Sequence, residues 1–117
     1  MHFAISASWG PTDTTRAMLP FIFAASALQV KDKVTIMLFH DAAHLALRGV
    51  AKNIVPVGPP QRFEEVIDDS NAKLLICKPC AEVRNIFKEN CLDKIIFGGM
   101  NDFHLACSLP DTKIICY

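Results

Sequence analysis

The sequence lacks an excess of charge of either sign. Twelve basic residues balance twelve acidic ones, so the formal net charge is zero. Proteins that bind nucleic acid or an anionic membrane surface usually carry clustered positive charge, and no such cluster occurs here. We therefore expect neither nucleic acid nor a membrane among the partners of this protein.

The sequence also lacks a hydrophobic run that is long enough to cross a bilayer. Its longest apolar stretch covers residues 17–28, whereas a membrane-spanning helix needs about 20 apolar residues. Residues 3–7 form a strand-like run, without the charged segment or cleavage signal of a secreted protein. Five cysteines are an odd number for a disulfide framework. We therefore expect free thiols in the reducing environment of the cytoplasm.

What the sequence does contain is an alternation of apolar runs and amphipathic stretches. The chain has 117 residues, which predicts a single domain over 1–117. The runs Leu74-Leu75-Ile76 and Ile95-Ile96-Phe97 are typical of parallel strands that are covered on both faces. We predict a three-layer α/β/α sandwich with a five-stranded, mostly parallel sheet. The expected strands are 2–8, 34–39, 73–77, 94–97 and 112–116, and the expected helices are 13–29, 41–48, 62–69, a helix from about 80, and 101–107.

The first predicted helix has almost no polar face between Met18 and Leu28. A helix that is apolar all round is buried all round. In so small a domain we expect part of this surface to lie against another subunit, which predicts a homo-oligomer. The alternative is that neighbours within the same chain cover the helix. In the helix from about 80, we expect Val83, Ile86 and Phe87 to point inward.

Ligand sites in parallel sheets lie beyond the carboxyl ends of the strands. One of these ends carries the motif Cys77-Lys78-Pro79-Cys80. A helix that begins at Cys80 would stabilise its thiolate, so we expect Cys80 to be the nucleophile, with Cys77 within disulfide reach. Lys78 adds positive charge. The alternative is that both cysteines are structural. We predict no metal site, because no second pair of ligands accompanies the motif.

Polar residues at two other strand ends are further candidates. His40 follows the second strand and is suited to tuning a thiol or moving a proton; alternatively, Asp41 caps the next helix and His40 is incidental. Asp13 and Arg16 open the first helix, where they either bind an anion or serve as a cap. No phosphate loop or dinucleotide fingerprint is present, so we expect no cofactor.

Several runs together resemble the DsrE/DsrF-like (DsrEFH) sulfur-relay family, with its YchN-like and TusD-like members. They are residues 13–17, 19–21, 34–39, 77–84 and 95–117. The resemblance implies a five-stranded parallel sheet between helix layers, and homo- or hetero-oligomers that are often trimers or hexamers. It also implies a cysteine persulfide after the third strand, at the position of Cys80. The chain departs from the family at Asn85, where glycine often follows the motif Arg84, and at His40-Asp41, where a small turn is expected.

The leading hypothesis is therefore a sulfur carrier or sulfurtransferase. Cys80 would accept sulfane sulfur as a persulfide, and Cys77 would attack that persulfide to release sulfide. The expected partners are sulfur donor and acceptor proteins or small sulfur species. Two alternatives stay open. One is a thiol–disulfide oxidoreductase that uses Cys77 and Cys80, and the other is a non-catalytic oligomeric interaction module.

Overall fold

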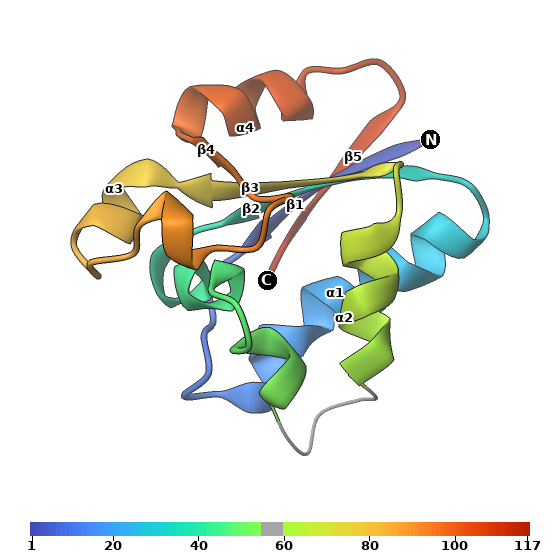
Figure 1. Cartoon of the computed structure of the whole chain (residues 1–117). Coiled ribbons are helices and arrows are strands. Elements are labelled where there is room, and N and C mark those ends of the chain that lie inside the picture. The colour runs from blue at the N-terminus through green and yellow to red at the C-terminus, as the bar shows by residue number, and fades with distance from the viewer. Residues whose placement is uncertain (55–59) are drawn as a thin grey trace.

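The protein folds as a parallel sheet between two layers of helices (Figure 1). This computed structural model describes residues 1–54 and 60–117. All strand pairs are parallel, in the order β4-β3-β2-β1-β5. Helix α4 covers one face of the sheet, and α1 and α2 cover the other. The predicted three-layer α/β/α sandwich is confirmed. The strands are β1 (His2–Ala7), β2 (Lys33–Leu38), β3 (Ala72–Cys77), β4 (Ile96–Gly98) and β5 (Thr112–Cys116).

The helical segments lie close to where the sequence predicts them, but not all of them are α-helices. The segment expected as an α-helix at 41–48 is a 3-10 helix, η1 (His40–Ala46). A short 3-10 turn, η2 (Ala51–Asn53), follows it. No helix among the described residues is long and apolar enough to cross a membrane. The other helices are α1 (Thr14–Gln29), α2 (Pro60–Asp68), α3 (Lys78–Glu82), η3 (Lys88–Asn90) and α4 (Met100–Cys107).

Helix α1 is covered by its own chain. It packs between the sheet and α2, where the rings of Phe21 and Phe63 lie 4.7 Å apart. Leu19, with 39% of its surface exposed, is its one large apolar residue that is exposed. The alternative in which neighbours in the same chain bury this helix is therefore correct, and the apolar helix gives no separate indication of another subunit.

The opposite face of the sheet is covered less completely. Phe103 of α4 packs edge-on against Phe39, with ring centroids 5.6 Å apart, above the buried side chains of Met37 and Leu75. β4 is a short edge strand, and its Ile96 is 45% exposed. The expectation that this strand is covered on both faces was therefore wrong, because α4 is the one described helix on this side. Other exposed apolar side chains in this region are Met100, Leu105, Leu109 and Ile114.

The helix after β3 is shorter than the sequence pattern suggested. Helix α3 ends at Glu82, and the chain turns through Asn85, which has a left-handed φ of 54°. The backbone N–H of Ile86 then donates to the carbonyl of Ala81 at 2.9 Å. Because this turn ends the helical periodicity, Ile86 is buried, but Val83 and Phe87 are exposed rather than inward.

The surroundings of His2 predict how the free energy of unfolding depends on pH. Its ring nitrogens lie 2.9 Å from the Thr112 hydroxyl and 2.8 Å from the Thr35 hydroxyl. Burial, aided by the charge of Lys33, lowers the pKa of His2 below its usual 6.5. The unfolded chain therefore binds this proton more readily, and the free energy of unfolding should decrease as pH falls below about 6.5. In urea titrations at pH 7.5 and 5.5, His2→Gln should lose part of this decrease. An equal decrease in both proteins would contradict the assignment.

Candidate functional site

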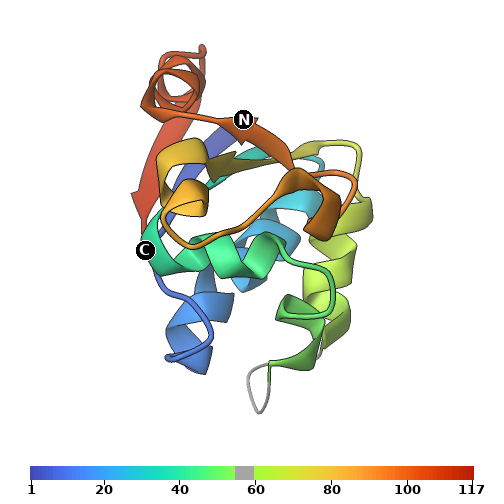
Figure 2. The same cartoon turned by 60° about the vertical axis from the view of Figure 1, so that its left-hand side comes forward.

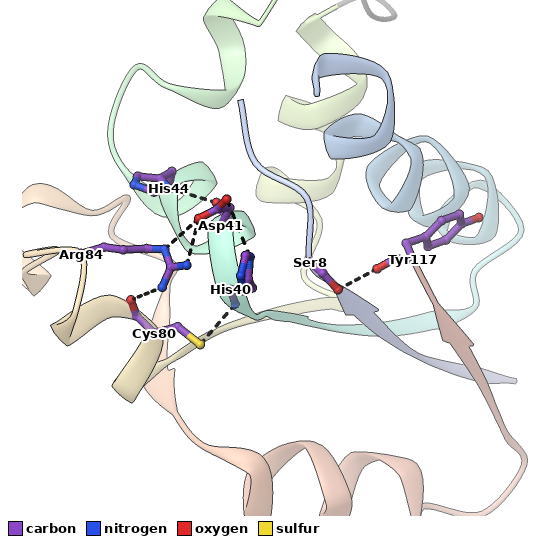
Figure 3. A network of polar contacts seen from close by, with 7 residues as sticks. All are labelled: Ser8, His40, Asp41, His44, Cys80, Arg84 and Tyr117. Carbon is purple, nitrogen blue, oxygen red and sulfur yellow. Dashed lines mark hydrogen bonds and ion pairs between the residues drawn. The ribbon is translucent and has the colours of Figure 1, made fainter. Parts of the chain in front are cut away.

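The two cysteines of the motif lie at the carboxyl edge of the sheet, and Figure 3 shows Cys80 there. Cys77 is the last residue of β3 and the N-cap of α3, and Cys80 is the third residue of that helix. The helix was expected to begin near Cys80, but it begins at Lys78 and has five residues. Cys80 lies within the first turn of this helix, but the hydrogen bond that its sulfur accepts does not come from the helix N-terminus. Instead, the backbone N–H of His40, from the turn after β2, donates to Cys80 Sγ at 3.2 Å.

Cys77 and Cys80 differ in their surroundings. Cys77 is buried beneath α4, with 8% of its surface exposed. Burial raises the pKa of the Cys77 thiol, and a side-chain hydrogen bond with Cys80 adds to this effect. Cys77 therefore stays protonated at neutral pH. Cys80 is partly exposed and has a fixed donor at its sulfur. The arrangement suits Cys80 to react with an external molecule and Cys77 to react only with its neighbour.

The hydrogen bond to Cys80 depends on an unusual backbone conformation. His40 has a φ of 51°, in the left-handed region that residues other than glycine rarely adopt. The loop after β1 also packs tightly against this turn. A Cβ added at Gly10 would lie 2.4 Å from the carbonyl oxygen of Asp41. Only glycine permits this approach, so Gly10 helps to position a turn that is distant from it in the sequence.

An ion pair ties this turn to the segment that follows Cys80. Arg84 donates from Nε and Nη2 to one carboxylate oxygen of Asp41, at 3.0 and 2.9 Å, and from Nη1 to the carbonyl of Cys80 at 3.2 Å. The hydrogen bond from Arg84 lowers the pKa of Asp41, so this carboxylate is ionised at neutral pH. The interpretation of Asp41 as a helix cap was wrong. The N-cap of η1 is Phe39, and no side chain bonds there.

The sequence did not identify Asp41 as a site residue, because its partner is 43 positions away. The only available signal was topological. β2 and β3 are neighbours in the sheet, so the segments after their carboxyl ends lie side by side. Figure 2 shows the result, with η1 alongside α3. Sequence reasoning named Arg84 and His40 separately, and the structure brings them together with Cys80 through Asp41.

The other predicted candidates lie farther from the thiols. Asp13 caps α1 by accepting from the backbone N–H of Arg16 at 3.1 Å, as the capping interpretation expected. The Arg16 guanidinium lies 4.5 Å from the centre of the Trp9 ring. Lys78 is exposed and borders a depression whose other side is formed by residues 98–102. In the described part of the chain, no three His, Cys, Asp or Glu side chains are grouped so as to hold a metal ion.

The two departures from the family resemblance have a common physical basis. His40 and Asn85 stand where the resemblance suggested small or glycine-containing turns, and both have positive φ, 51° and 54°. Asparagine tolerates this conformation better than most residues, and Asn85 supplies it just after α3 ends. Both turns therefore keep a glycine-like backbone although they carry other side chains.

Fold and site together define a small α/β protein with a cysteine pair at the carboxyl edge of a parallel sheet. The chain belongs to the DsrE/DsrF-like family, whose model matches residues 1–108. It is 28% identical over 106 residues to the uncharacterized protein MJ0760 of Methanocaldococcus jannaschii. That match covers 89% of this chain but 38% of the relative, so the chain spans well under half of that protein's length.

The crystal structure of the ychN protein from E. coli has the same fold. The two structures superpose with a TM-score of 0.78, over 100% of this chain and 99% of the other. Their sequences are 17% identical. At this identity the likeness shows the fold and does not extend to the activity.

The geometry predicts a ranking of thiol reactivity. Cys80 should react with iodoacetamide faster than Cys77 and Cys91, because burial raises the pKa of both of those thiols. Arg84→Gln should lower the rate of Cys80 alkylation several-fold at pH 7.5. The substitution removes the ion pair with Asp41, which holds the neighbouring His40 N–H against the sulfur. Site-resolved mass spectrometry measures each rate. The exposed Cys116 is the internal control and should not change. Labelling of Cys80 no faster than Cys91 would contradict the ranking.

Proposed function

We propose that the protein carries sulfur as a persulfide on Cys80. The observation that supports this most directly is the hydrogen bond from the His40 backbone N–H to Cys80 Sγ, at a partly exposed position. Such a donor stabilises negative charge on sulfur, in the attacking thiolate and in the anionic persulfide. Membership of the DsrE/DsrF-like family agrees with a sulfur-relay role.

In the first step, the Cys80 thiolate attacks the sulfane sulfur of a donor such as thiosulfate or an organic persulfide. A bond forms between Cys80 Sγ and that sulfur, and the sulfur–sulfur bond of the donor breaks. The donor leaves as sulfite or as a thiolate, so the step needs no external oxidant or reductant. The terminal sulfur then passes to a thiolate acceptor, which regenerates the Cys80 thiolate.

Cys77 provides a second outcome. Its side chain lies close enough to that of Cys80 to add to the raised pKa of Cys77. After loss of its proton, it would attack Cys80 Sγ, form the Cys77–Cys80 disulfide and release the terminal sulfur as hydrosulfide. The raised pKa of Cys77 makes this attack slow at neutral pH, which favours storage of the persulfide over its release.

The contact between the two thiols also supports a second candidate function. A thiol–disulfide oxidoreductase would cycle the same pair between dithiol and disulfide. A buried, protonated Cys77 would act as the resolving thiol in either function, so its state does not separate the two. Membership of the DsrE/DsrF-like family favours the carrier. An interaction module with structural cysteines would need neither thiol to react.

Sulfur loading tests the proposal. Exposure to thiosulfate or polysulfide should add about 32 Da per sulfur atom to the chain, and dithiothreitol should remove it. Cys80→Ser should abolish this adduct. Cys77→Ser should still load and should hold the adduct longer, because no neighbouring thiol releases it. Intact-mass spectrometry over time measures both effects.

Loading of Cys80→Ser to the same extent as the unmodified chain would overturn the assignment to Cys80. A reversible loss of about 2 Da in the unmodified chain, together with no loading of Cys77→Ser, would instead favour the oxidoreductase. The carrier also forms the Cys77–Cys80 disulfide after it releases sulfur, but it should still load when Cys77 is absent. The exposed Cys116 provides a matched control, since Cys116→Ser should load normally.

We also propose that the protein forms a homo-oligomer. The α4 side of the sheet carries several of the large apolar side chains that remain exposed, and they include Leu105 at 64% and Ile114 at 55% exposure. Light scattering at micromolar concentration should give a mass above that of one chain. Leu105→Glu should lower this mass, whereas Leu19→Glu on α1 is the matched control and should not. A single-chain mass for the unmodified protein would contradict the proposal.

A further inference from the structure

The sheet has a topological switch point between β1 and β5. From β1 the chain moves outward through β2, β3 and β4, and it then returns to place β5 on the other side of β1. The connection after β1 runs through α1 on one face of the sheet, whereas β5 is reached through α4 on the opposite face (Figure 1). Crevices beyond the carboxyl ends of strands at such a point are the usual ligand sites of open parallel sheets.

A cavity lies at this point. It has a volume of about 440 Å³, within the range of small-molecule sites. Its lining comes from the loop after β1, the turn after β2 and the end of β5, which are three adjacent strands. The lining residues are Ser8, Trp9, Thr12, His40, Asp41 and Tyr117. Topology and cavity therefore indicate the same place independently.

The lining favours a small organic cation. Asp41 is the one acidic side chain among these residues, and no lysine or arginine lines the cavity. Arg84 occupies only one oxygen of that carboxylate, and the other has His40 Nδ1 at 3.7 Å. Trp9 is 41% exposed. The guanidinium of Arg16 lies over the Trp9 ring and is 3.8 Å from Asp13. An aromatic wall beside a carboxylate is suited to an ammonium group.

One residue joins this cavity to the thiol. His40 borders the cavity, and the backbone N–H of the same residue donates to Cys80 Sγ. Figure 3 shows His40 between Cys80 and Ser8, with the sulfur directed toward His40. Cys80 itself does not line the cavity, so a small molecule held against Trp9 and Asp41 would have to extend past His40 to reach the sulfur.

We propose that this cavity binds a low-molecular-weight aminothiol, which serves as the sulfur acceptor. Its ammonium group lies against Asp41 and the aromatic wall, and its thiolate attacks the terminal sulfur of the Cys80 persulfide. The acceptor gains a sulfur–sulfur bond, the bond between Cys80 Sγ and that sulfur breaks, and Cys80 leaves as the thiolate. The acceptor role rests on the proposed function, whereas binding of the ammonium compound does not.

The test separates binding from sulfur chemistry. Three thioethers of similar size, 2-(methylthio)ethylamine, 3-(methylthio)propionate and 2-(methylthio)ethanol, differ in charge and cannot form persulfides. Trp9 is the only tryptophan of the chain, so its fluorescence reports occupancy of the cavity. The titrations use the full chain at pH 8, where imidazole groups are mainly neutral. The amine should bind saturably and roughly tenfold more tightly than the other two compounds, which corresponds to about 1.4 kcal/mol.

Two variants and a control complete the test. Asp41→Asn should abolish the preference for the amine, whereas Asp93→Asn removes a carboxylate that is 98% exposed and does not line the cavity, and should change nothing. If Asp41→Asn does not fold, Trp9→Leu, followed by calorimetry, should still lose binding. Equal binding of the three compounds, no binding of the amine, or undiminished binding by Trp9→Leu would overturn the site. Sulfur loading without amine binding would leave the carrier function standing and remove only this inference. Amine binding without sulfur loading would leave the binding site standing and remove the carrier function.

Discussion

The ion pair between Asp41 and Arg84 is the constraint on which the geometry of the thiol site depends. It joins the turn after β2 to the segment after α3, and Arg84 also holds the carbonyl of Cys80. Because Asp41 is fixed, the preceding residue is fixed as well, and its backbone N–H points at the sulfur. The arrangement requires a left-handed φ at His40 and close packing at Gly10, so the site is held by strain that the surrounding fold must oppose.

The layered architecture explains why two cysteines three positions apart behave differently. β3 is an inner strand, and its last residue, Cys77, points into the small cluster beneath α4. The chain then leaves the sheet, and by Cys80 it has reached the partly exposed carboxyl edge. One thiol is therefore kept protonated by burial, while the other is accessible to external molecules. The thin cover on the α4 side keeps this edge open.

The sequence predicted those features that depend on local pattern. The apolar run 74–76 is fully buried as expected, and the alternation of elements led to the parallel sheet. Features that depend on a distant partner were missed. The burial of α1 comes from α2 and the sheet, and the role of Asp41 comes from Arg84, 43 positions away. Hydrophobic periodicity records that a side chain is buried, but it does not record which element covers it.

The two positive-φ turns show where this chain differs from the pattern that it resembles. A glycine at either position would provide the same backbone conformation without a side chain. At Asn85 the added side chain follows α3 and borders neither the depression beside Lys78 nor the cavity between β1 and β5. At His40 the backbone still donates to Cys80, and the residue also borders the cavity between β1 and β5. The departure therefore leaves the thiol geometry intact and changes the wall of the neighbouring cavity, which is where selectivity for a small partner would arise.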